Sequence, residues 1–250
     1  MSSMDHVMQE VFAHVADSRH WDIFPHASVP LPGFLTQHGA AVIVGAVLTL
    51  AIAVFLPKIS KRWASLVELL VLFVRDAIAV PNMGEEDGKR MTPLLCSLFC
   101  FILVMNLAAL IPGFPAATGN LSVTAALATV TLAAMTVGAA FQVGPKRFFM
   151  GFVAPGVPWP ILLILVPIEI AGLFIRSFAL AIRLFANLLA GHLVLFSIMG
   201  VIVVFGPKAA PLELMAVLIY MIEVLVAFLQ AYIFTLLSAI FIGQRLHPAH

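Results

Sequence analysis

Residues 173–198 read LFIRSFALAIRLFANLLAGHLVLFSI, a run apolar enough to cross a lipid bilayer that nevertheless contains Arg176 and Arg183. A cation near the middle of a bilayer costs about 2.5–3.5 kcal/mol even on lenient insertion scales. Arginine cannot avoid this cost by losing its proton, since its pKa lies above about 12. Arg183 therefore needs a polar cavity or an acidic partner, which favours an ion pathway. The alternative is a cation whose long side chain reaches the membrane interface.

The composition predicts an all-α integral membrane protein. Apolar residues make up 62% of the 250 residues, charged residues only 10%, and the mean hydropathy is +1.11. These values lie outside the range of soluble proteins. The net charge of +1 argues against nucleic-acid binding. Cys96 and Cys100 share a helix face and are interpreted as packing residues, and no spacing typical of metal ligands is found.

Hydropathy predicts about five transmembrane helices and one interfacial helix within a membrane domain over residues 38–250. The helices are expected over residues 39–56, 61–79 (interfacial), 93–111, 121–143, 161–205 and 211–243. Residues 1–37 form a polar N-terminal segment without the basic start of a secretory signal peptide. The last two helices exceed the roughly 30 Å hydrocarbon core, so they must tilt, kink or project beyond it. A long tilted C-terminal hairpin, well suited to contact a large partner, is therefore expected.

Charges suggest the orientation of the chain. Lys61, Glu68 and Arg75 are seven residues apart and form one stripe of an amphipathic helix. If this helix lies flat on the membrane, the basic residues around it fall on one side, as the positive-inside rule prefers. If the helix instead spans the membrane, these basic residues fall on both sides. The flat placement puts the N-terminus outside and the C-terminus, with Arg245, inside. Residues 81–90 are expected to form a polar loop.

Polar residues recur along one stripe of the helix at 161–205. Glu169, Arg176 and Arg183 are spaced by seven, Asn187 lies one turn beyond Arg183, and His192 points nearly opposite to Arg183. Glu223 and Gln230 are likewise seven apart in the last helix.

An antiparallel pairing about Gly206 brings Arg183 to the level of Gln230 and His192 near that of Glu223. This predicts an outer cluster of His192 with Glu223 and an inner cluster around Glu169 and Arg176, with Arg183 between them. Burial can shift glutamate and histidine toward proton exchange near neutral pH, whereas arginine stays a fixed positive barrier.

Structural alternatives exist for each group. Glu169 could cap a helix or lie at the interface, and Glu223 with His192 could form a static interhelical hydrogen bond. Arg176 could reach the inner interface. Asn187 and Gln230 are residue types that often join helices in membranes.

Three segments together resemble subunit a of the F-type ATP synthase, the proton-channel subunit of the Fo sector. They are AIRLFANLLAGHL at 181–193, LQAYIF at 229–234 and MNLAALIP at 105–112. The resemblance extends from about residue 38 to the C-terminus. It implies that Arg183 is the essential arginine facing a carboxylate on a ring of c subunits. Gln230 and Asn187 then match the glutamine and asparagine beside that arginine.

The resemblance also implies roles for the ionisable clusters. His192 and Glu223 match a pair in the outer half-channel, in the arrangement that resembles the mitochondrial and alphaproteobacterial form. Glu169 matches an acid of the inner half-channel and Arg176 a basic position. Some members of the family have an acid where this chain has Ala109, so no role in the outer path is expected for Ala109.

The implied function is proton translocation through two offset half-channels, coupled to c-ring rotation and ATP synthesis. ATP chemistry falls to other subunits, so the chain is not an enzyme alone, and no cofactor is expected. Implied partners are the c-ring, the b-type subunits of the peripheral stalk, the remainder of the F1Fo complex, membrane lipids and protons, without nucleic acid. The acidic N-terminal segment favours a bacterial inner membrane over a mitochondrial one, with a periplasmic N-terminus and a cytoplasmic C-terminus.

Two rival functions are open. The first is a self-contained ion-coupled secondary transporter or channel, although the polar residues concentrate after residue 168 and the chain shows no internal repeat of the kind many transporters have. The second is a membrane scaffold in which Arg183 only pairs with an acid of a partner.

Overall fold

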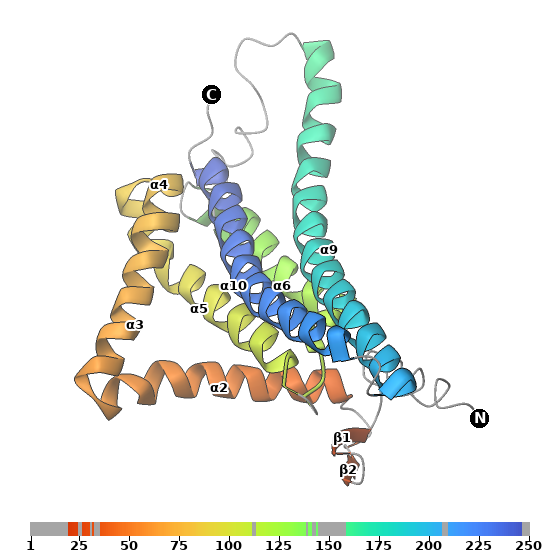
Figure 1. Ribbon diagram of the computed structural model, residues 1–250. Helices are drawn as coiled ribbons and strands as arrows, with labels where there is room; N and C mark the ends of the chain where they lie inside the picture. The colour runs from red at the N-terminus through yellow and green to blue at the C-terminus, as the bar shows by residue number, and fades with distance from the viewer. Residues whose placement is uncertain are drawn as a thin grey trace. The chain divides into compact units, whose positions relative to one another are not determined.

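The computed structural model describes residues 20–24, 27–30, 32, 36–111, 114–138, 140–141, 144, 159–206 and 210–246, and these are mainly helical (Figure 1). The predicted class, an all-α integral membrane protein, is confirmed. A short antiparallel hairpin of β1 (His20–Phe24) and β2 (Ala27–Pro30) is the exception, and it was not predicted. Most of the polar segment at 1–37 lies outside the described residues. So do four of the thirteen lysine and arginine residues: Arg19, Lys146, Arg147 and Lys208.

The helical elements follow one another along the whole described chain. They are α2 (Gln37–Ile59), α3 (Lys61–Phe73), the π-helix η1 (Val74–Ala79), α4 (Val80–Met83), α5 (Glu85–Ala109), the 3-10 helix η2 (Ala117–Gly119), α6 (Leu121–Ala133), the π-helix η3 (Ala134–Gly138), α9 (Trp159–Phe205) and α10 (Ala210–Leu246). Within the described residues, α2, α5, α9 and α10 are long and apolar enough to cross a membrane. The apolar helix Leu121–Val137 is shorter.

The N-terminal part of α5 replaces the polar loop expected at 81–90. Gly84, with a φ of 81°, follows the end of α4, and α5 begins directly after it. The first turn of α5 contains Glu85, Glu86 and Asp87, and carboxylates at this end stabilise a helix through its dipole. Hydropathy alone missed this start because the first turns of the helix are polar.

The two C-terminal helices are longer than a bilayer requires, as predicted. α9 contains 47 residues and α10 contains 37, which correspond to about 70 Å and 55 Å at 1.5 Å per residue. Pro160 occupies the second position of α9, where proline is tolerated, and Pro167 lies inside the helix without ending it. Pro155 and Pro158 lie outside the described residues.

The chain divides into two compact units, and each of the long helices α2, α5, α9 and α10 contributes residues to both. The first unit comprises Met1–Ile52, Cys100–Thr124 and Arg183–Ala231. The second unit comprises Ala53–Phe99, Ala125–Ile182 and Tyr232–His250.

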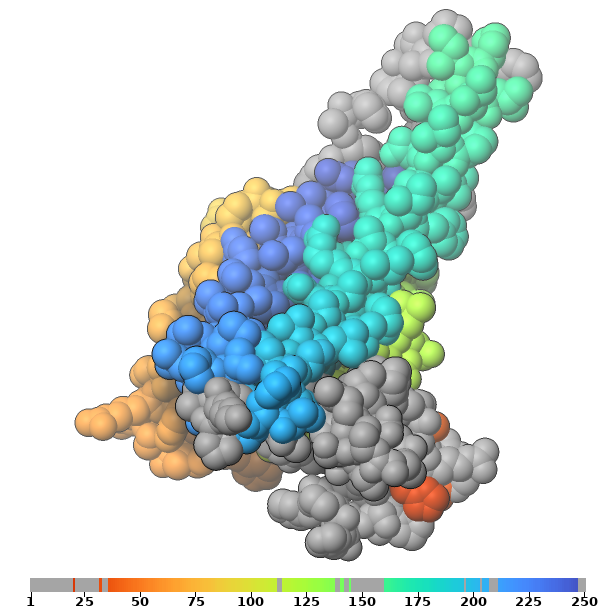
Figure 2. Space-filling view, turned by 45° about the vertical axis from the view of Figure 1, so that its right-hand side comes forward, coloured from red at the N-terminus to blue at the C-terminus, as the bar shows by residue number. Residues whose placement is uncertain are grey.

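In the first unit, the C-terminal half of α9 and the N-terminal half of α10 lie side by side (Figure 2). A small buried core joins α2, α5 and η2 through Ala41, Met105 and Ala117. Gly45 of α2 packs so closely on Met105 that an added Cβ would overlap its sulfur atom. Small residues therefore let α2 approach α5, as is common between membrane helices.

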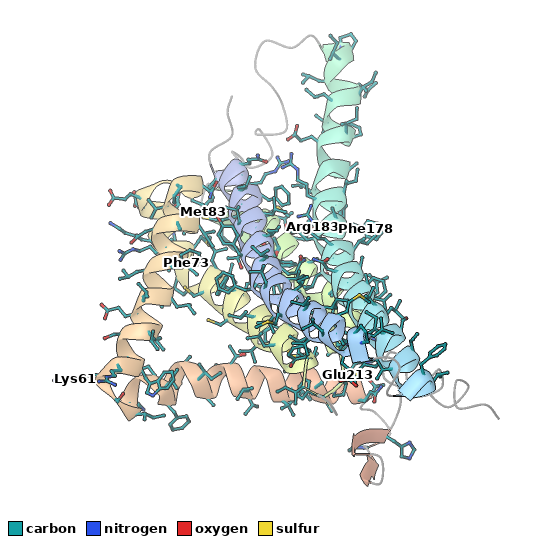
Figure 3. All side chains as sticks on the ribbon, viewed as in Figure 1. Lys61, Phe73, Met83, Phe178, Arg183 and Glu213 are labelled. Carbon is teal, nitrogen blue, oxygen red and sulfur yellow. The ribbon has the colours of Figure 1, made fainter. Side chains whose placement is uncertain are left out.

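In the second unit, Phe73, the last residue of α3 (labelled in Figure 3), contacts two aromatic residues. Its ring centroid lies 6.2 Å from that of Phe99 in α5 and 5.9 Å from that of Tyr232 in α10. At the end of α10, Gly243 packs against the backbone of Asn82 in α4. These contacts hold the last turns of α10 against the segment that runs from α3 to α4.

No residue of α3 is buried, and its apolar side chains Trp63, Leu66 and Leu69 are exposed. An amphipathic helix with a free apolar face is what an interfacial position needs. The interfacial placement of residues 61–79 stays a prediction.

Candidate functional site

A cavity of about 250 Å³ lies among α5, α9 and α10 in the first unit. Most of its fifteen lining residues are apolar, and five are polar: Asn106, Asn187, His192, Glu223 and Gln230. A water molecule in the liquid occupies about 30 Å³, so the cavity has room for several waters beside these groups. Four of the five, all except Asn106, are site residues predicted from the sequence.

His192 and Glu223 are brought together in this cavity, as the antiparallel pairing predicted. His192 is only 5% exposed. Glu223 comes so close to α9 that a Cβ on Gly191 would lie 2.8 Å from its Oε1 atom. Both carboxylate oxygens are shielded from solvent, and neither bonds a described residue. The static hydrogen bond between Glu223 and His192, considered above as an alternative, is therefore not formed.

Asn187 and Gln230 connect α9 with α10. The Nδ2 atom of Asn187 donates a hydrogen bond to Oε1 of Gln230 at 2.9 Å. Gln230 is 3% exposed, whereas Asn187 is exposed. Gln230 was predicted at the level of Arg183, and its hydrogen bond is with Asn187, one helical turn further along α9.

Arg183 projects from α9 (Figure 3) and is exposed. Its neighbours Ala181 and Leu184 are buried against the protein. Within the described part of the chain, the Arg183 guanidinium forms no hydrogen bond or ion pair. No described residue therefore compensates its positive charge.

A second polar cluster lies in the second unit. Nη2 of Arg245 donates to Oε1 of Glu169 at 3.0 Å, and Nη1 of Arg176 donates to Oε1 of Gln244 at 2.7 Å. The Arg176 guanidinium also lies 5.4 Å from the ring centroid of Phe241. Glu169 and Arg176, which were expected to form one inner cluster, therefore have separate partners on α10. Glu169 lies ten residues after the first residue of α9, so it does not cap that helix.

Three residues of these sites, Asn106, Thr118 and Arg245, are not among those predicted from the sequence. Thr118 Oγ1 donates to Oδ1 of Asn106 at 2.9 Å, and both residues are buried. An asparagine inside the apolar run at 93–111 could have drawn attention to Asn106. Thr118 lies in a segment without charge, and Arg245 was interpreted only as a flanking cation. No sequence pattern pointed to either partner.

Ionisable side chains lie inside two of the membrane helices, α9 and α10. They define a class of multi-pass helical membrane proteins in which such groups typically mark ion pathways. The profile of the family described as ATP synthase A chain matches residues 35–243. This chain belongs to that family.

Individual relatives agree with the family match. The chain is similar to ATP synthase subunit a of Myxococcus xanthus, with 46% identity over 192 residues, covering 75% of this chain and 62% of the relative. It is 47% identical over 185 residues to ATP synthase subunit a of Anaeromyxobacter dehalogenans, covering 72% of this chain and 48% of the relative. It thus spans between about half and two thirds of the length of these two relatives. The match to ATP synthase subunit a of Chloroherpeton thalassium has 40% identity over 257 residues, covering 95% and 77%.

Proposed function

We propose that this chain is the stator subunit of the Fo sector of an F-type ATP synthase. In this proposal it supplies two offset proton half-channels and the arginine that couples proton translocation to rotation of a ring of c subunits. ATP chemistry takes place on other subunits of the complex. The proposal is supported by the family to which the chain belongs and by the two clusters of ionisable groups.

The observation that carries the proposal is the uncompensated charge of Arg183. A guanidinium in an apolar helix is expensive unless an opposite charge meets it, and no described residue of this chain does so. A carboxylate presented by a partner is the simplest counter-ion. A c-ring carboxylate passing α9 would meet Arg183 on this exposed face.

The outer half-channel is proposed to use Glu223 and His192. A proton from outside passes through these groups in the cavity and neutralises a carboxylate of the ring. A neutral carboxyl group can then face lipid, which an ionised one cannot do cheaply. The membrane potential contributes about 2.3 kcal/mol per proton per 100 mV.

The inner half-channel is proposed to pass Glu169, with Arg176 as a nearby basic group. After nearly a full rotation, the ring carboxyl releases its proton toward Glu169. Arg183 then attracts the carboxylate and blocks a direct leak between the two half-channels. The hydrogen bond between Asn187 and Gln230 holds α9 and α10 together one turn from Arg183.

The proposed setting is a bacterial inner membrane with a periplasmic N-terminus and a cytoplasmic C-terminus. The proposed partners are the c-ring, the b-type subunits of the peripheral stalk, the remaining subunits of the complex and membrane lipids.

The test is acid-driven ATP synthesis by the assembled complex in vesicles, comparing wild type with Arg183→Ala. Loss of synthesis, with the complex intact and the passive proton leak retained or raised, supports the proposal. Arg62→Ala, which removes an exposed cation of α3, is the control and should leave synthesis unchanged. Unchanged synthesis in Arg183→Ala would refute the coupling role, and failed assembly would favour the scaffold. A self-contained transporter would instead move its substrate as the purified chain alone.

A further inference from the structure

We infer that Arg245 is a positioning residue for Glu169, and that it holds the carboxylate where protons are released along the inner path. This inference rests on the proposed role of Glu169 in the inner half-channel. Its basis is the ion pair in which Nη2 of Arg245 lies 3.0 Å from Oε1 of Glu169.

The two partners of this ion pair differ in exposure. The Arg245 side chain is 7% exposed, whereas that of Glu169 is 32% exposed. The cation is thus buried within the protein, and the carboxylate that it bonds is partly accessible. Within the described residues, only Arg245 bonds the carboxylate, and it does so through Oε1. The Oε2 atom of Glu169 is left available to exchange a proton.

Arg176 does not serve as this counter-ion. It lies seven residues from Glu169 on the same helix, which corresponds to about 10 Å along the axis. Its guanidinium donates to Gln244 and lies over the ring of Phe241. Adjacent residues of α10, Gln244 and Arg245, therefore engage two different groups of α9, and the fixed charge next to Glu169 comes from Arg245.

The chemistry of arginine suits this role. Its guanidinium stays protonated, so it provides a permanent charge and a directional donor without competing for the transported proton. Without Arg245, the partly buried carboxylate would lose both its counter-ion and its anchor. The carboxylate would then leave the position at which it meets the released proton, and release along the inner path would slow.

The experiment uses the assembled complex in vesicles and measures acid-driven ATP synthesis per assembled complex. The variants are Arg245→Gln, Arg245→Lys, Glu169→Gln and the double variant Arg245→Gln/Glu169→Gln. We expect Arg245→Gln to lower the rate about tenfold, less than the roughly hundredfold that a 1 Å displacement of a reacting group can cost. Arg245→Lys should recover most of the rate because it keeps the charge. The double variant should be no slower than Glu169→Gln alone, since Arg245 acts through Glu169.

Lys89→Gln is the matched control. It removes a cation of the second unit whose bond to Glu85, at 2.8 Å, is exposed, and it should not change the rate. Arg245→Gln could lower the amount of assembled complex instead of the rate. Recovery of assembly in the double variant Arg245→Gln/Glu169→Gln then supports the inference, because the carboxylate that had lost its counter-ion is gone. Persistence of the assembly defect overturns it.

Three further results would overturn the inference: a normal rate in Arg245→Gln, a normal rate in Glu169→Gln, or an equal additional loss from Arg245→Gln in the Glu169→Gln background. None of these depends on Arg183. If Arg183→Ala abolishes synthesis while Arg245→Gln does not, the proposed function stands and the positioning role fails. If Arg183→Ala is without effect, the proposed function fails first.

Discussion

The carboxylate of Glu223 occupies the space that a side chain at Gly191 would need, since a Cβ built on Gly191 would lie 2.8 Å from Oε1 of Glu223. The glycine thus lets an acid of α10 approach the backbone of α9 beside His192. Because the atom in the way is the end of a flexible side chain, a methyl group at residue 191 would displace the carboxylate without separating the helices.

We therefore predict that Gly191→Ala leaves the complex assembled but lowers acid-driven ATP synthesis about tenfold or more, because the proton-exchanging group is displaced. Gly172→Ala is the matched control, since a Cβ at this glycine of α9 would meet nothing within 4 Å. Both rates are measured per assembled complex. Equal rates for the two variants would show that the position of Glu223 is not critical.

The hydrogen bond between Asn187 and Gln230 predicts an energetic coupling between α9 and α10. Asn187→Ala and Gln230→Ala should each lower the rate of ATP synthesis, and the double variant should lose less than the product of the two effects. The coupling expected for an interhelical hydrogen bond in a membrane is about 0.6 kcal/mol and at most about 1.7 kcal/mol. The rates of the wild type, the two single variants and the double variant, converted to free energies, give this coupling energy.

Ser197 provides the control for this double-mutant comparison of Asn187 and Gln230. Its hydroxyl donates to the carbonyl oxygen of Leu193 in the same helix, at 2.6 Å. Ser197→Ala combined with Gln230→Ala should therefore give additive effects. A coupling of similar size in both cycles would contradict an interaction specific to Asn187.

Hydropathy and spacing were sufficient for the main features of the fold. The length of the two apolar C-terminal runs predicted helices longer than a bilayer, and α9 and α10 have that length. The turn near Gly206 set the approximate pairing of the two helices, which places His192 and Glu223 in one cavity. Helix length depends on local sequence, and the pairing of α9 with α10 depends on the one turn between them. Both can therefore be predicted without knowledge of the tertiary structure.

The partners of the polar groups could not be predicted in the same way. Arg245 bonds Glu169 across 76 positions of sequence, and a shift of one residue in the register of α10 would exchange it for Gln244. Thr118 reaches Asn106 from a short helix, η2, for which the sequence carried no prediction. These contacts depend on side-chain direction at an exact register, which periodicity alone does not determine.

The buried bond from Thr118 to Asn106 predicts a difference between two conservative substitutions. Thr118→Val removes the hydroxyl donor and leaves Oδ1 of Asn106 unsatisfied, which costs about 1–3 kcal/mol. Thr118→Ser keeps the donor and should cost less. Thermal denaturation of the assembled complex measures the difference, and the midpoint of the serine variant should lie above that of the valine variant. Equal midpoints for the valine and serine variants would mean that the hydrogen bond adds no stability.

The close approach of α10 to α4 predicts that Gly243 tolerates no side chain. A Cβ at this position would overlap the backbone carbonyl oxygen of Asn82, and backbone cannot move aside as a side chain does. Gly243→Ala should therefore destabilise the chain by about 1–3 kcal/mol, the usual range for overpacking. Gly45→Ala is the informative comparison, because its Cβ would overlap the sulfur of Met105, a flexible side chain that can change rotamer. Thermal denaturation of the two variants should place Gly243→Ala below Gly45→Ala, and the reverse order would show that α10 and α4 can separate at little cost.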